Sequence, residues 1–108
     1  MTKERIENFP ADDFRKNAKE FQEPNLTRNL ALAKKLKEIG GRHGLTAGAA
    51  AVAWTLNQKA VTGAIVGARR PDQVDETVKA GDFRLSPEEI KEIESEFDKI
   101  SARYVEGV

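Results

Sequence analysis

The sequence predicts an α/β protein of which this chain supplies mostly helices and about one strand. Four segments carry the apolar period or the capping residues of helices, and one short apolar run is flanked by glycines. The predicted order is helix, apolar helix, strand, helix, helix, which is typical of the end of an alternating α/β fold. Because a single strand cannot pair its own main chain, we expect its neighbouring strands to lie outside these 108 residues.

The composition is that of an ordinary globular protein and argues against several classes of function. Charged residues make up 33% of the chain, and 18 basic side chains balance 18 acidic ones. Proteins that bind nucleic acid through overall charge usually carry a basic excess, so no nucleic acid partner is expected. The N-terminus lacks the apolar core of a secretory signal and no apolar run is long enough to span a membrane, so we expect a cytoplasmic protein without membrane contact.

The chain has no cysteine, which excludes a disulfide, a thiolate zinc site and a cysteine nucleophile. It also lacks a metal-ligand cluster, a Ser/His/Asp arrangement and a Walker-type phosphate loop. We therefore expect no metal site.

Residues 1–25 form a polar opening region. Asp12 and Asp13 follow Pro10, which suits the first turn of a short helix because acidic side chains are stabilised at the positive helix end. Aromatic side chains are expected to pin this long loop onto another surface, namely Phe9, Phe14 and Phe21.

Two helices are predicted in the middle of the chain. Residues 26–39 place their apolar side chains within about half of a helical wheel, and Gly40-Gly41 predicts a C-terminal stop. The next helix begins after Thr46, which is suited to the N-cap position, and it is apolar on every side. Such a helix is expected to be buried on all sides.

A strand is predicted over residues 62–66, because its apolar run is too short for a helix. A third helix opens at Pro71 and is expected to end at Gly81. The last helix begins with a capping box formed by Ser86 and Glu89, and the tail from about residue 102 is expected to fray. Its apolar side chains recur every three or four residues, at Ile90, Ile93, Phe97 and Ile100.

The segment between residues 67 and 73 combines features that favour phosphate binding. Two small residues and two arginines stand between the end of the predicted strand and the start of a helix. A helix start offers unpaired N–H groups, and an arginine fork can bind phosphate through two hydrogen bonds. In the alternative interpretation, Arg69 and Arg70 are solvated loop residues that pair with Asp72 or Asp75.

Beyond these local patterns, the chain resembles the C-terminal third of an aldo-keto reductase, especially the bacterial members related to potassium-channel β-subunits. The resemblance is carried by segments that follow the family's order. They are FPADDFR at residues 9–15, Phe21, NLAL at 29–32, LTAGAAAVAWTL at 45–56, IVGARRPDQVDE at 65–76 and LSPEEI at 85–90.

The resemblance implies the C-terminal part of a (β/α)8 TIM barrel. The chain would be a single segment, in which residues 1–25 are the loop after the seventh strand. Residues 26–108 would supply the last helices, the eighth strand and the C-terminal helix. The implied function is NADP(H) binding within a protein that reduces a small carbonyl substrate to an alcohol, with the substrate held by the rest of the barrel.

The resemblance also implies which residues bind the cofactor. Those matching the contacts to the adenosine 2′-phosphate are Gly67, Ala68 and Arg69, and those beside the adenine are Gln73 and Glu76. Thr77 departs from the asparagine usual in the family, and residues 46–49 depart from its usual Thr-Pro-Ala-Gln.

No catalytic residue is expected in this chain, because the family's catalytic aspartate, tyrosine, lysine and histidine come from the first half of the barrel. Tyr104 and His43 are expected to be surface or packing residues, and no carboxylate partner is evident near His43. Whether the parent protein is an enzyme stays open, as does whether the chain is a fragment, a split reductase or a full product.

Two alternative functions belong to other classes. One is a barrel that binds cofactor and acts through association, like a channel β-subunit. The other is a non-catalytic helical interaction or DNA-binding module, suggested by the alanine-rich stretch after Gly44, although the zero net charge argues against it. An unpaired strand at residues 62–66 would also offer an exposed edge for self-association.

Overall fold

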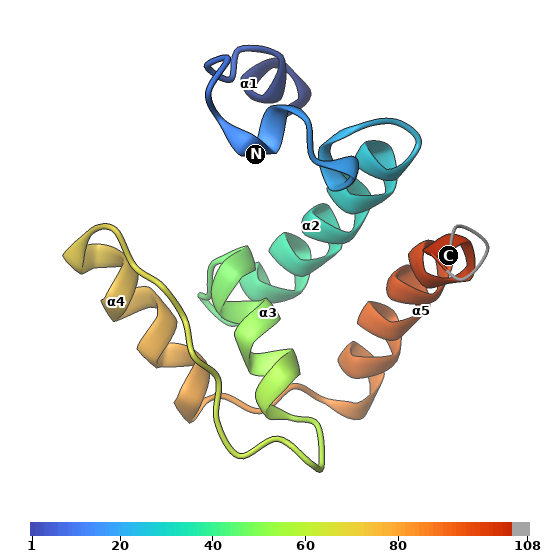
Figure 1. Cartoon of the computed structure of the whole chain (residues 1–108). Coiled ribbons are helices and arrows are strands. Elements are labelled where there is room, and N and C mark those ends of the chain that lie inside the picture. Colours follow the sequence, from blue (N-terminus) through green and yellow to red (C-terminus); the bar gives the residue numbers. More distant parts are fainter. Residues whose placement is uncertain (105–108) are drawn as a thin grey trace.

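The structure is a computed structural model that describes residues 1–104, and this part of the chain is helical without strands. The prediction of a mostly helical chain is therefore confirmed. Figure 1 shows α2 and α3 packed together at the centre, with α4 and α5 on opposite sides of them. The elements in order are α1 (Lys3–Glu7), η1 (Phe14–Lys16), η2 (Lys19–Phe21), α2 (Asn25–Arg42), α3 (Ala47–Leu56), α4 (Pro71–Val78), η3 (Lys79–Asp82) and α5 (Pro87–Tyr104), where η denotes a 3-10 helix. Among the described helices, none has both the length and the apolar character needed to cross a membrane.

The strand predicted at residues 62–66 is wrong for this chain on its own. The connection from α3 to α4 runs past α3 as an irregular segment (Figure 1), and residues 62–68 take part in none of the main-chain hydrogen bonds found among the described residues. Ile65 is fully exposed and Val66 is 47% exposed. A strand forms only against a neighbouring strand, and residues 1–104 supply none.

The first long helix, α2, also ends differently from the prediction, because it continues through Gly40 and Gly41 to Arg42. Gly44 has a φ of 70° and supplies the left-handed residue of the stop. The Leu45 N–H then donates to the Gly40 carbonyl oxygen over 2.8 Å. A Cβ on Gly40 would lie 2.7 Å from the Leu45 carbonyl oxygen, so this glycine is needed for close approach of the returning chain.

The core lies where α2, α3, α5 and the η3 region meet. Thr46 is the N-cap of α3 as predicted, since its Oγ1 accepts from the Ala49 N–H over 3.1 Å. The expectation that α3 is buried on all sides is only partly right, because Val52 and Leu56 are half-buried on the side that faces α4. The buried cluster consists of Ile39, Ala49, Ala53, Ala80, Leu85 and Ile93.

The last two helices begin where the sequence predicts. α4 starts at Pro71 but ends at Val78, and Gly81 lies in the following 3-10 helix. The capping box of α5 is confirmed, since Ser86 and Glu89 exchange two hydrogen bonds of 3.1 Å. α5 extends to Tyr104, past the predicted start of fraying, and the rest of that tail lies outside the described residues.

The N-terminal region packs partly on itself. Phe9 is buried, and its ring lies 5.9 Å from that of Phe21, whereas Phe14 is 80% exposed. The short helix predicted to start at Pro10 does not form there; a 3-10 helix begins instead at Phe14, after Asp13, whose side chain accepts from the Arg15 N–H. Two of the three phenylalanines therefore hold the loop together internally.

Candidate functional site

The five predicted cofactor-binding residues lie at the end of the α3–α4 connection and on the first two turns of α4. Gly67, Ala68 and Arg69 are exposed, whereas Gln73 and Glu76 are half-buried. The structure distributes these residues over three hollows rather than one.

The first, which we call the polar hollow, has a volume of about 370 Å³ and lies between the start of α3 and the start of α4. It brings together three of the predicted residues, Gly67, Gln73 and Glu76. Arg70, which the sequence analysis named beside Arg69 as a possible phosphate ligand, lies there too. Sequence reasoning missed the residues at the start of α3, namely Thr46 and Gly48.

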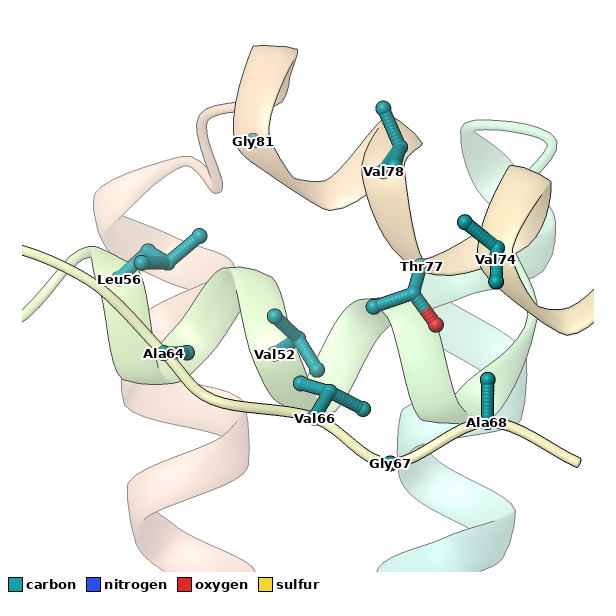
Figure 2. A pocket seen from close by; sticks show the side chains of 10 residues that line it. All are labelled: Val52, Leu56, Ala64, Val66, Gly67, Ala68, Val74, Thr77, Val78 and Gly81. Atoms are coloured by element: carbon teal, nitrogen blue, oxygen red, sulfur yellow. The ribbon is translucent and has the colours of Figure 1, made fainter.

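The second, the apolar hollow, has a volume of about 410 Å³ and contains Ala68 and also Gly67. Figure 2 shows it between α3, the connection and α4. The side chains around it are mainly aliphatic and come from all three segments, namely Val52, Leu56, Ala64, Val66, Val74, Thr77 and Val78, with Gly81 at one end.

Arg69 lies apart from both of these, in an N-terminal hollow of about 580 Å³ that it shares with residues 10 and 12–15. Here Arg15 is fixed by Asp13, with 3.0 Å between Nε and Oδ1 and 2.6 Å between Nη2 and Oδ2. The Arg15 guanidinium also lies 4.2 Å from the centre of the Phe9 ring. Hydrogen bonds from Arg15, with a smaller contribution from the charge of Arg69, lower the pKa of Asp13 to about 2.

The turn that carries the two arginines is held by Gln73. Its Oε1 accepts from the Arg69 N–H over 2.7 Å and from the Arg70 N–H over 3.2 Å. Two of the N–H groups just before α4 are thus already hydrogen-bonded. Arg70 pairs with Asp72 over 3.2 Å, as the alternative interpretation of the sequence expected, and both side chains are exposed.

His43 has a carboxylate partner, which corrects the sequence analysis. Its Nε2 lies 2.7 Å from Oε2 of Glu89, a carboxylate that Arg42 also approaches to 3.6 Å. Burial raises the pKa of Glu89, but hydrogen bonds from His43 and Ser86 outweigh it and hold the pKa below its ordinary value. Sequence spacing gave no signal of this pair, because α2 and α5 meet only in the folded chain.

Metal-ligating side chains do not gather in groups of three or more anywhere in residues 1–104. Instead, neutral and charged hydrogen-bonding groups lie around the hollows. Two exposed arginines lie beside the start of α4. Such groups can bind a phosphorylated organic ligand.

Comparison with known proteins places these features in a family. The model of the aldo/keto reductase family matches residues 1–97. An aldo-keto reductase of Schizosaccharomyces pombe that carries NADP(+) in its name is 34% identical over 104 residues, covering 94% of this chain and 31% of that protein.

Two further relatives are similar. An aldo-keto reductase of Strobilurus tenacellus is 31% identical over 84 residues, covering 78% of this chain and 25% of its own. A putative voltage-gated potassium channel subunit beta of Schizosaccharomyces pombe is 35% identical over 79 residues, which cover 71% of this chain and 23% of that protein. The chain thus spans less than a third of the length of these curated relatives.

Proposed function

Because this chain belongs to the aldo/keto reductase family, whose fold is a (β/α)8 barrel, we propose that it supplies the NADP(H)-binding C-terminal part of such a barrel. In this proposal residues 1–25 are the loop after the seventh strand, and residues 26–108 supply the last helices, the eighth strand and the C-terminal helix. The observation that carries the proposal is the polar hollow, where Gly67, Gln73 and Glu76 lie together beside Arg70.

The residues around the hollows fit the adenosine end of NADP(H). Glu76 offers a carboxylate that can accept from the adenine amino group, and Gly67 leaves the main chain open to close approach. Arg69 and Arg70 are exposed on either side of the turn, where a guanidinium can bind the 2′-phosphate through a charge-assisted fork. At Arg70, Asp72 competes with the phosphate, because its carboxylate already pairs with the Arg70 side chain.

The reaction proposed for the whole protein is reduction of a carbonyl compound to an alcohol. When bound, NADPH supplies a hydride to the carbonyl carbon. The role of the present residues is to bind and orient the nucleotide, while the proton donor and its partners would come from the rest of the barrel. A relative with NADP(+) in its name supports this choice of cofactor.

A titration with adenosine 2′,5′-bisphosphate, followed by backbone amide NMR shifts of the 108-residue chain, tests the proposal. We expect saturable shifts at Gly67, Gln73 and Glu76, and none around His43 and Glu89, which lie at the junction of α2 and α5. The ligand 5′-AMP should bind more weakly. Shifts spread over the whole chain, or none at millimolar ligand, would contradict nucleotide binding here.

A second candidate function is a cofactor-binding barrel that acts through association. It is favoured by the 35% identity to a protein named as a putative potassium channel subunit beta. Both candidates share the nucleotide site, so nucleotide affinity does not separate them. Steady-state turnover of NADPH with an aldehyde by the full-length protein does, because only the reductase consumes the cofactor.

A further inference from the structure

We propose that Gln73 is a positioning residue, which acts through its side-chain oxygen to hold the Arg69–Arg70 turn in the shape that binds the 2′-phosphate. The inference deepens the proposed function and rests on it for the identity of the ligand. The closing of the turn by Gln73, in contrast, is a property of the chain that can be tested without any ligand.

The geometry that carries the inference is a pair of hydrogen bonds converging on one atom. Gln73 Oε1 accepts from the N–H groups of two consecutive residues, over 2.7 Å from Arg69 and 3.2 Å from Arg70. Since main-chain N–H groups can only donate, the atom that receives them must be the amide oxygen rather than the nitrogen. The Gln73 N–H in turn donates to the Arg70 carbonyl oxygen over 3.1 Å, so side chain and main chain close the turn from both directions.

Gln73 is well placed for this role. It stands at the third position of α4, and its half-buried side chain lines the polar hollow. The two donors fill the lone pairs of its oxygen, which leaves only the amide nitrogen to meet a ligand. A simple adenine contact through the oxygen would break the turn.

The consequence of a fixed turn is that its two arginines point to different places. Arg69 lines the N-terminal hollow with Asp13 and Arg15, whereas Arg70 lines the polar hollow with Glu76. Without the acceptor, the main chain at residues 69 and 70 gains conformational freedom that phosphate binding must remove again. Loss of Gln73 Oε1 should therefore weaken binding of the phosphate more than binding of the adenine.

The test compares Gln73→Leu, which removes the acceptor at similar size, with Gln73→Glu, which keeps an acceptor oxygen. Amide NMR of the 108-residue chain measures solvent exchange at Arg69 and Arg70. We expect faster exchange at both amides in Gln73→Leu and near wild-type exchange in Gln73→Glu. Gln22→Leu, at an exposed glutamine far along the chain, is the matched control and should change neither amide.

Binding is measured on the same variants with adenosine 2′,5′-bisphosphate and with 5′-AMP. For Gln73→Leu we expect about tenfold weaker binding of the bisphosphate, from the loss of two hydrogen bonds, and less than about threefold for 5′-AMP. Equal losses for both ligands would make Gln73 a direct adenine contact, and unchanged amide exchange would show that it does not hold the turn; either result overturns the inference. If the wild-type chain binds neither ligand, the proposed function fails, while the exchange rates still decide whether Gln73 closes the turn.

Discussion

Arg69 is the residue on which cofactor choice is expected to depend. NADPH differs from NADH by one phosphate, and a charge-assisted hydrogen bond to it contributes about 1.5 to 3 kcal/mol. In the full-length protein, Arg69→Ala should weaken NADPH binding by about 10- to 150-fold and leave NADH binding nearly unchanged, as measured by the dissociation constants of both cofactors. Equal losses would mean that Arg69 is structural, and the phosphate contact would pass to Arg70, which lines the polar hollow.

Glu89 should make the chain sensitive to acid. Its side chain is 8% exposed and its pKa lies below the ordinary 4.5 in the folded state, so ionisation stabilises the fold above that pH. This stabilisation is lost as the pH falls from 4.5 through the lower folded pKa. The urea concentration at the unfolding midpoint should be lower at pH 3.5 than at pH 5.5. This decrease should be smaller in Glu89→Gln than in wild type.

The control for this variant is Glu92→Gln, because the Glu92 side chain is 39% exposed, against 8% for Glu89, and pairs only with Arg42 among the contacts found. The urea midpoint of Glu92→Gln should decrease between pH 5.5 and pH 3.5 by the same amount as that of wild type. If Glu89→Gln showed the full wild-type loss between the two pH values, the low pKa of Glu89 would not be a source of stability.

At the scale of the elements, the two glycines near the end of α2 offer a sharp comparison. A Cβ on Gly40 would meet the Leu45 carbonyl oxygen at 2.7 Å, whereas one on Gly41 would meet nothing within 4 Å. Gly40→Ala should destabilise the chain by about 1 to 3 kcal/mol, because the main chain around Leu45 must move. Gly41→Ala should instead stabilise it by up to about 1 kcal/mol, since alanine is the better helix former.

Chemical denaturation of both variants under the same conditions measures the difference. Two alanine variants of equal stability would show that the α2–α3 turn adapts freely. In that case the close approach at Gly40 would not constrain the turn that carries Thr46.

The connection between α3 and α4 should promote self-association of the isolated chain. Ile65 is fully exposed, and residues 62–68 leave their main-chain groups without partners among the described residues. Such a segment can pair with another copy, and a lysine at its centre opposes pairing. Sedimentation at increasing protein concentration should show association in wild type and in Gln22→Lys, and less in Ile65→Lys. Equal association of all three would rule out this segment as the contact.

These elements also show what local sequence can predict. The helix starts at Thr46, Pro71 and Ser86 were predictable because a cap depends on residues within one turn. The strand at 62–66 was not, because its pairing needs residues far away in sequence. Gly40 was misread for the same reason, since its role is set by the chain that returns from α2.

The residues of the candidate site likewise divide into those that local sequence predicts and those that depend on distant segments. Residues 67–76 are contiguous, so their grouping at one turn could be predicted from the sequence, and the resemblance supplied their roles. The additions from Thr46 and Gly48, and the approach of Asp13 to Arg69, depend on how distant segments pack. The hydrogen bonds of Gln73 were missed because a glutamine at the third helical position has several possible partners.

For the whole molecule, the apolar hollow indicates where further structure is to be expected. α3 is apolar on every side, yet Val52 and Leu56 remain half-buried beside a cavity of about 410 Å³ (Figure 2). On the other side of that cavity, Val74 and Val78 are 48% and 63% exposed. We infer that the remaining strands of the proposed barrel would cover this surface and pair with residues 62–66, which fits the chain's share of less than a third of its relatives.

In the proposed barrel the proton donor comes from residues outside this chain. We therefore expect that the 108 residues alone do not reduce an aldehyde with NADPH. Protonation of the developing alkoxide needs a positioned acid, which typically contributes about 10²- to 10⁴-fold to the rate. His43 is engaged by Glu89 at the junction of α2 and α5, and the sequence has one tyrosine, Tyr104, at the end of α5. The absorbance of NADPH should stay constant when the chain and an aldehyde are both present. Turnover that disappears in Tyr104→Phe would instead make this tyrosine the acid and overturn the assignment of catalysis to the rest of the barrel.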